Sequence, residues 1–278
     1  MKRPTVLIPA LRALLAITLV ILLAEVVFRR YLVPILGVRL TDTPDFRQWP
    51  EMLYLGVLFP VVMASLALFL HRFLDRRPWQ EFGLGIDRRA RRVTVAGAAL
   101  MSAGYGAFIG ITGLADLLRW SIAPSVTWRF LLTASATYLG TGLWEEFFFR
   151  GYLYRTLKAY GKPVAYVVSI ALFSLIHFTE EPLILPRVLN LLLVSFFLTY
   201  IYDRSNSIWP GVILHGGWNL LSFLTVSNQL RVTPLSVQGP AGGAIRWFST
   251  VLHLLLTALV WRSYRSASGT CHTADQDR

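Results

Sequence analysis

The sequence predicts an all-α protein, a polytopic bundle of about eight membrane helices with both termini in the cytoplasm. The 278 residues are 55% hydrophobic and only 15% charged, and the mean hydropathy is +0.53. This composition is too apolar for a soluble domain. Apolar runs of about 20 residues, the length that spans a bilayer, recur along the chain. Arginines gather in the short connections between these runs, which is typical of cytoplasmic loops.

The first apolar segment, residues 6–28, begins like a signal peptide because Met1-Lys2-Arg3 precede it. No small-x-small cleavage pattern ends the segment, and Arg29 and Arg30 follow it directly. We therefore expect a retained first transmembrane helix. A second apolar segment, residues 52–70, completes the pair of N-terminal helices that we assign to 6–70.

Six further apolar segments follow, and the sequence shows no internal repeat or low-complexity region that would divide the chain. They cover roughly residues 93–114, 129–149, 163–178, 186–202, 208–226 and 244–262. We therefore expect one integral membrane domain over 1–278. Within it, a motif-bearing core spans about 130–226, and a polar tail follows at 263–278.

Basic residues predict the orientation of the bundle. The connection at residues 71–92 carries Arg72, Arg76, Arg77, Arg88, Arg89, Arg91 and Arg92, so it is expected in the cytoplasm. An even number of helices places both termini on the same side. Within this connection, Arg77–Gly85 mixes aromatic and charged residues, which predicts a turn lying at the membrane interface.

The net charge of +12 follows from this topology. No basic face lies outside the membrane-flanking loops, so we expect no nucleic-acid partner. The single Cys271 excludes a disulfide framework and a cysteine-rich metal site. Glu25, His71 and His253 are expected to be interfacial or solvated groups without a catalytic role.

The stretch Trp144–Arg150 is the most informative part of the sequence. It places Glu145, Glu146 and Arg150 in an apolar helix, where ionisable groups are costly and mark functional sites. Glu146 and Arg150 are i,i+4 neighbours in the favourable order, whereas Glu145 points about 100° away. Glu146 is therefore predicted to pair with Arg150, and Glu145 to face another group.

Three more polar side chains lie within apolar segments. His177 ends the fifth segment, and His215 and Asn219 share one helix face in the seventh because they are four residues apart. Taken singly, each is typical of interhelical hydrogen bonding. Gly216 and Gly217 follow His215 and indicate either close helix packing or room for a substrate backbone.

Helix geometry predicts that these groups lie at one depth. Glu145 and His177 are each 16 residues from Gly161, the expected turn, which corresponds to about 24 Å. His215 lies about 14 Å from its own turn. The depths agree if the hairpin 150–162 projects about 10 Å beyond the membrane. Carboxylates, imidazoles and an amide at one depth indicate a water-activating site.

Three motifs in this order resemble the CPBP (CAAX protease and bacteriocin-processing, or ABI) family of intramembrane proteases. They are Glu-Glu-x-x-x-Arg at 145–150, Phe-x-x-x-His at 173–177 and His-x-x-x-Asn at 215–219. The family includes the CAAX prenyl proteases of the Ras-converting type. The resemblance covers about 140–225, and the turn at 77–85 also looks like a family segment.

The resemblance implies an intramembrane endopeptidase in the cell membrane, acting on a membrane-associated protein or peptide. By this resemblance Glu145 and His177 activate water, and His215 and Asn219 stabilise the oxyanion. The supporting residues are Glu146, Arg150 and Phe173. Whether the substrate is prenylated is left open, as is the role of the loop 227–243, which is either a substrate gate or a simple connection.

Alternatives to this interpretation remain. A histidine and an amide on one face suit an oxyanion hole better than a metal-ligand set, and His-Glu-x-x-His is absent, so no cofactor is expected. Zinc held by Glu145, His177 and His215 is the alternative mechanism. A transporter using Glu145 and Glu146 as a relay is disfavoured by the lack of a repeat, and a non-catalytic bacteriocin-immunity or scaffold protein is the other alternative.

Overall fold

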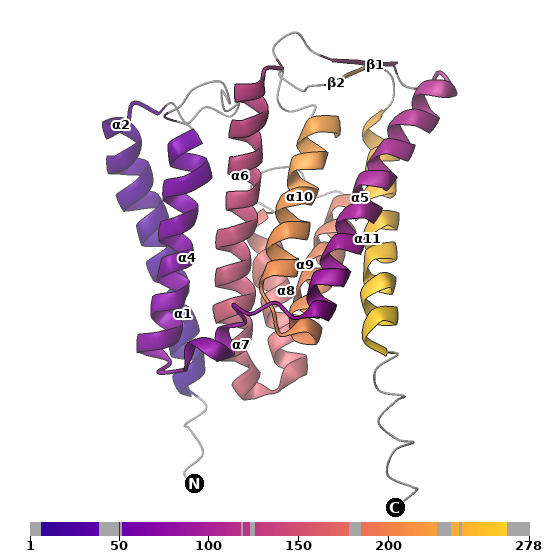
Figure 1. Cartoon of the computed structure of the whole chain (residues 1–278). Helices are drawn as coiled ribbons and strands as arrows, with labels where there is room; N and C mark the ends of the chain where they lie inside the picture. Colours follow the sequence, from indigo (N-terminus) through magenta and orange to yellow (C-terminus); the bar gives the residue numbers. More distant parts are fainter. Residues whose placement is uncertain are drawn as a thin grey trace, which may run out of the picture.

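The computed structural model is a bundle of membrane-type helices, which confirms the all-α class (Figure 1). It describes residues 7–38, 50, 52–117, 119–122, 126–177, 185–226, 235–238 and 241–265. Within this part of the chain, each of the eight expected apolar segments is helical. Several helices contain π-helical turns, so one continuous helix can carry several labels.

The first half of the bundle consists of three long helices and a short connection. They are α1 (Leu7–Leu22) with η1 (Leu23–Leu32) and α2 (Val33–Ile35); η2 (Met52–Leu58) with α4 (Phe59–Phe69) and η3 (Leu70–Leu74); the 3₁₀ turn η4 (Trp79–Phe82); and α5 (Arg88–Leu114). Helix α5 begins before the expected residue 93 because Asp87 caps it, accepting a hydrogen bond from the Ala90 backbone N–H at 2.6 Å.

The second half contains the motif-bearing helices. They are α6 (Trp128–Glu146), continued by η5 (Phe147–Tyr154), α7 (Arg155–Leu157) and η6 (Lys158–Tyr160); α8 (Lys162–His177); α9 (Leu185–Ser205); α10 (Trp209–Val226); and α11 (Ala241–Arg265). Two short strands, β1 (Arg119–Ile122) and β2 (Leu235–Gln238), pair antiparallel and add to the expected fold. Strand β2 lies in the loop 227–243, whose other residues fall largely outside the described part of the chain.

Among the described helices, three are long and apolar enough to cross a membrane by themselves. They cover Ile8–Ile35, Leu53–Leu74 and Arg88–Leu114. Helix α8 is apolar but shorter. Helix α6 packs against both α4 and α10, and Figure 1 shows it between them. The helix that carries the two glutamates is therefore flanked by helices from both halves of the bundle.

The connection between α6 and α8 contains the expected turn and two buried tyrosines. The turn at Gly161 is present, with φ +98, and α8 starts at the next residue. Tyr152 and Tyr154, which belong to the expected hairpin 150–162, are both 0% exposed within the bundle. Their aromatic rings join the core cluster around η5, because burying that apolar area is more favourable than exposing it.

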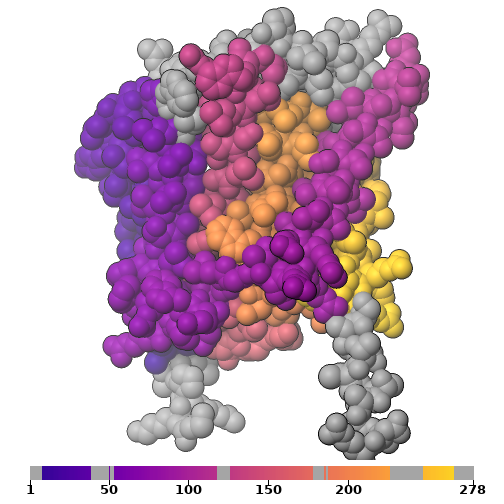
Figure 2. Space-filling view, in the orientation of Figure 1, coloured from indigo at the N-terminus to yellow at the C-terminus, as the bar shows by residue number. Residues whose placement is uncertain are grey.

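The sequence predicts that Arg77–Gly85 is a turn at the membrane interface. It does not predict that this segment also packs on the helical core, which the structure shows. Phe82 is fully buried and fills the space left by Gly151, where an added Cβ would lie 2.3 Å from the Phe82 ring. The Gly83 carbonyl accepts a hydrogen bond from Ile208 N at 2.8 Å. Trp79 remains exposed. In Figure 2 the connection from α4 to α5 crosses the lower part of α10.

Two histidines expected at the interface are buried instead. His71 is 1% exposed and its Nε2 lies 3.0 Å from the Pro78 carbonyl oxygen. His253 is 2% exposed and its Nδ1 lies 2.9 Å from the Ser249 carbonyl oxygen. A backbone carbonyl thus satisfies one nitrogen of each ring, which lowers the cost of burial. Glu25 is exposed as expected.

Candidate active site

The predicted pair of Glu146 and Arg150 is present and fully buried. Arg150 Nη1 donates to Glu146 Oε1 at 2.8 Å, and both side chains are 0% exposed. Glu146 is the last residue of α6 before the helix continues as η5. On α10, Gly211 leaves room for this carboxylate, because an added Cβ there would lie 2.8 Å from Glu146 Oε2.

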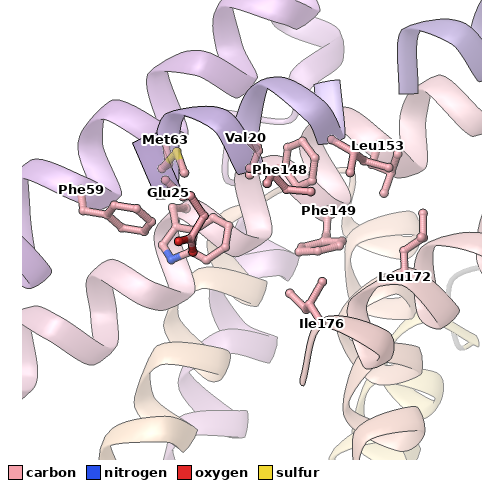
Figure 3. Close-up of a pocket in the computed structure, with 13 residues that line it drawn as sticks. Val20, Glu25, Phe59, Met63, Phe148, Phe149, Leu153, Leu172 and Ile176 are labelled. Carbon is pink, nitrogen blue, oxygen red and sulfur yellow. The ribbon is translucent and has the colours of Figure 1, made fainter. Parts of the chain in front are cut away.

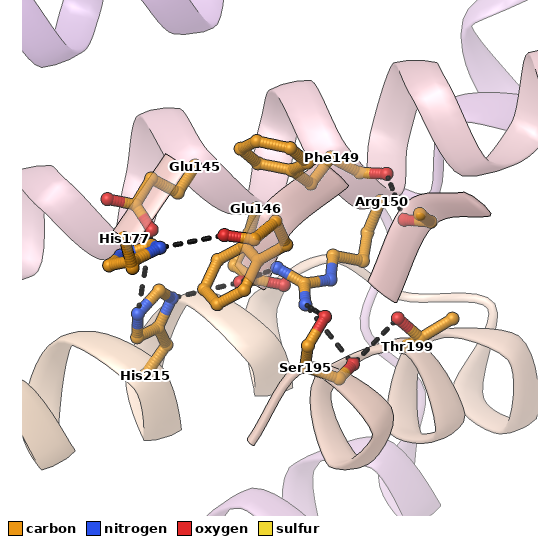
Figure 4. Close-up of polar contacts among 10 residues, drawn as sticks. Glu145, Glu146, Phe149, Arg150, His177, Ser195, Thr199 and His215 are labelled. Atoms are coloured by element: carbon orange, nitrogen blue, oxygen red, sulfur yellow. Dashed lines mark hydrogen bonds and ion pairs between the residues drawn. The ribbon is translucent and has the colours of Figure 1, made fainter. Parts of the chain in front are cut away.

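Ser195 on α9 is a supporting residue that the sequence analysis missed. The other arm of Arg150, Nη2, donates to the Ser195 carbonyl at 3.2 Å and to its hydroxyl at 3.1 Å. The Arg150 guanidinium also lies 4.4 Å from the centre of the Phe173 ring, within the range of a cation–π interaction. A single serine in an apolar helix does not indicate in the sequence that it accepts hydrogen bonds from a buried arginine. Figure 4 shows Arg150 held between Glu146 and Ser195.

His215 connects the two glutamates. Its Nδ1 lies 2.9 Å from Glu146 Oε1, and its Nε2 lies 3.7 Å from Glu145 Oε2. An ionised carboxylate only accepts hydrogen bonds, so the ring donates from Nδ1 to Glu146. Glu146 therefore fixes the tautomer and the orientation of His215, as well as pairing with Arg150.

His177 is oriented by its own helix. Its Nδ1 lies 2.8 Å from the Phe173 carbonyl oxygen, which only accepts, so Nδ1 carries a proton and Nε2 is left for the site. The Phe173 ring centre is 4.7 Å from that of His177 and 5.7 Å from that of His215. Figure 4 shows the His177 ring beside the Glu145 carboxylate. Phe173 thus packs against both imidazoles.

The predicted site residues converge except for one. Glu145 from α6, His177 from α8 and His215 from α10 meet at one depth, as expected from their spacing, and Glu145 is 5% exposed. Asn219 lies one turn further along α10 and is half-buried. Within the described part of the chain, no hydrogen bond or ion pair joins Asn219 to the cluster.

Glycines bring α6 and α10 close enough for these contacts. A Cβ added at Gly142 would lie 2.8 Å from the Gly216 backbone nitrogen, and one added at Gly216 would lie 2.8 Å from Leu139 Cα. Backbone atoms cannot yield as a flexible side chain can. The close-packing interpretation of Gly216 is therefore confirmed. Gly217 differs, because its nearest contact is the Met101 side chain at 3.5 Å.

Glu145, His177 and His215 are also the residues of the alternative zinc site. The described residues contain no group of three or more His, Cys, Asp or Glu side chains that could hold a metal ion. The Nδ1 atoms of His177 and His215 are both engaged with protein acceptors, an arrangement that also occurs in histidines that bind a metal through Nε2. Activity in the presence of a chelator distinguishes the two mechanisms.

An apolar groove of about 230 Å³ lies beside the polar cluster (Figure 3). Helices α1, η1, α4, α6, η5 and α8 line it. Trp144, Phe149 and Ile176, each the chain neighbour of a polar site residue, form part of its wall. Of the described lining residues only Glu25 is charged, so the groove suits an apolar occupant.

Comparisons with known proteins agree with the motifs. Residues 127–221 match the family model described as type II CAAX prenyl endopeptidase Rce1-like. The UPF0177 protein YxdF of Lactococcus lactis subsp. lactis (strain IL1403) is 29% identical over 109 residues, which are 39% of this chain and 54% of that protein. The chain thus matches about half the length of this curated relative. No solved structure matches the chain. The matched region contains every motif residue, which confirms the family resemblance.

Proposed function

We propose, on the premise that residues 127–221 match the type II CAAX prenyl endopeptidase family, that this chain is an intramembrane endopeptidase. The observation that carries the proposal is the meeting of Glu145, His177 and His215 from three helices inside that matched region. The substrate is a membrane-associated protein or peptide, and the enzyme is a multi-pass protein of the cell membrane.

In the proposed reaction, water attacks the scissile carbonyl from a position between Glu145 and His177. Glu145 takes a proton from the water as general base. Nδ1 of His177 donates to the Phe173 carbonyl oxygen, so Nε2 of this ring is unprotonated. Nε2 therefore accepts a hydrogen bond from the same water. The peptide C–N bond then breaks as the leaving amine receives a proton from the protonated base. All atoms come from the substrate and one water molecule.

His215 and Asn219 are the proposed donors to the oxyanion of the tetrahedral intermediate. His215 donates from Nδ1 to Glu146, so donation from Nε2 requires that the ring carry both protons. The carboxylates of Glu145 and Glu146 lie on either side of the ring, 3.7 Å from Nε2 and 2.9 Å from Nδ1. Asn219 reaches the oxyanion from the next turn of the same helix. Removal of one such donor costs about 10²–10³ in kcat.

The test compares membranes that contain the wild-type protein with membranes that contain Glu145→Gln. We expect an uncleaved precursor to accumulate with Glu145→Gln, His177→Ala and His215→Ala, detected by quantitative proteomics of the membrane fraction. Cleavage of that precursor by purified protein should fall about 10²–10⁴-fold in each variant. Asp87→Asn is the matched control, because it neutralises an exposed carboxylate outside both the cluster and the groove, and asparagine also caps a helix. It should retain wild-type turnover.

Folded Glu145→Gln protein that still cleaved the precursor at the wild-type rate would contradict the proposal and favour a non-catalytic role. A chelator should leave turnover unchanged. Loss of activity on chelation, restored by zinc, would instead support the metal-dependent alternative.

A further inference from the structure

We infer that Arg187 on α9 is a positioning residue for His177, an inference that rests on the proposed function of His177. Arg187 Nη2 donates to the His177 carbonyl oxygen at 2.7 Å. No motif contains Arg187, and α9 carries none of the residues that the sequence analysis placed in the site. The contact joins the beginning of α9 to the end of α8.

The position of His177 explains why such a contact is needed. His177 is the last described residue of α8, and the last four carbonyls of a helix have no partner within the helix. Helix ends open more easily than helix centres. A catalytic side chain in a last turn is therefore held poorly unless another element stabilises that turn.

The orientation of the His177 ring depends directly on that turn. Nδ1 reaches the Phe173 carbonyl oxygen at 2.8 Å across four residues, and this distance exists only while the turn stays helical. If the turn opens, Nδ1 loses its acceptor, and Nε2 no longer points at the water beside Glu145. Arg187 stabilises this turn because it donates a hydrogen bond to the His177 carbonyl oxygen.

Arginine suits the task for two reasons. Its planar guanidinium can satisfy carbonyl oxygens at a helix end with several donors, and its positive charge interacts favourably with the negative end of the helix dipole. A second contact made by α9 gives a further reason to use this helix as the anchor. Ser195, two turns beyond Arg187 on α9, holds Arg150, so α9 supports the His177 side and the Glu146 side of the site together.

The experiment measures the chemical reactivity of His177 in the full-length protein in detergent or nanodiscs. Diethyl pyrocarbonate modifies unprotonated imidazole nitrogens that solvent can reach, and peptide mass spectrometry gives the rate at His177. In Arg187→Gln we expect this rate to rise about threefold to tenfold, because the last turn opens more often. Arg187→Lys keeps a donor and the charge, so its rate should lie close to that of the wild type.

The control is Arg204→Gln, which removes an exposed arginine from the other end of the same helix and should leave the His177 rate unchanged. His71 and His253, both buried, serve as internal references for global unfolding. An unchanged rate at His177 in Arg187→Gln, or equal increases at all three histidines, would overturn the inference. If Arg187→Gln fails to insert, Arg187→Met takes its place, because it also removes the guanidinium donors and keeps an unbranched side chain. A rise at His177 with unchanged references then supports the inference, and an unchanged rate overturns it.

A cleavage assay separates this inference from the proposed function. Arg187→Gln should lower kcat about tenfold with KM within about twofold of wild type, since misplacement of a reacting group affects chemistry more than binding. Arg187→Lys should restore most of the loss. If the wild-type protein cleaves nothing, the proposed function fails, while the modification rates still decide whether Arg187 positions His177.

Discussion

At the scale of single residues, Glu146 combines two roles through one oxygen atom. Its Oε1 accepts from Arg150 at 2.8 Å and from His215 at 2.9 Å. The local sequence predicted the first contact, because i,i+4 neighbours meet on any helix. The second contact crosses between α6 and α10, and its effect is to set the tautomer of His215. Arg150 therefore neutralises a carboxylate whose proposed function is to orient a catalytic group.

The two contacts of Glu146 predict that apolar residues can replace the Glu146–Arg150 ion pair without loss of the fold but with loss of activity. Arg150→Met alone should lower the free energy of unfolding by about 3–5 kcal/mol, because it leaves Glu146 buried and uncompensated. The double variant Glu146→Leu/Arg150→Met should regain most of that stability, since apolar side chains can replace a buried pair. Denaturant unfolding in detergent measures the stability, and precursor cleavage measures the activity.

The double variant should remain inactive, because His215 then lacks the acceptor for its Nδ1 proton. A stable and active double variant would show that the pair contributes only to folding. Ser195→Ala is a milder comparison. It removes one of the two Ser195 acceptors of Arg150 and should cost about 1–3 kcal/mol.

At the scale of helices, the site depends on how closely α6 and α10 approach. Gly142 and Gly216 face backbone atoms of the opposite helix, so the two helices touch without intervening side chains. Such small-residue contacts are a common means of helix association in membranes. They also place His215 within reach of both glutamates, which a wider separation would prevent.

Two neighbouring glycines provide a matched prediction. Gly216→Ala forces a Cβ to within 2.8 Å of Leu139 Cα, so it should cost about 1–3 kcal/mol and reduce cleavage as the helices separate. Gly217→Ala meets only the Met101 side chain at 3.5 Å and should be neutral or slightly stabilising. Thermal unfolding and precursor cleavage of the two variants, measured side by side, check this. Equal effects of the two substitutions would contradict the contact.

At the scale of the whole molecule, the bundle has two distinct ends. The start of α1 and the end of α11 lie at one end, together with the connection from α4 to α5 (Figure 1). The paired strands β1 and β2 lie at the other end. The arginines at the start of α5 belong to the first end, so by the positive-inside rule we propose that this end lies in the cytoplasm.

Labelling of single cysteines tests this orientation in a Cys271→Ser background. Arg91→Cys is at the exposed start of α5, and Leu117→Cys is exposed just beyond its other end. In intact cells a membrane-impermeant maleimide should label Leu117→Cys and not Arg91→Cys, because the bilayer separates the two ends. Permeabilised cells should show both labels. The reverse pattern in intact cells would invert the proposed topology, and labelling of both would argue against a bilayer-spanning α5.

The sequence by itself determined the features that depend on neighbours along the chain. Apolar runs gave the helices, the four-residue spacing paired Glu146 with Arg150, and equal distances from Gly161 placed Glu145 and His177 at one depth. The tertiary structure alone decided the contacts between helices: Glu146 with His215, Arg150 with Ser195, Arg187 with His177, and Phe82 against Gly151. The physical reason is that such contacts depend on how each helix is rotated and how closely it packs. Those quantities result from packing over the whole bundle, and a single apolar segment does not encode them.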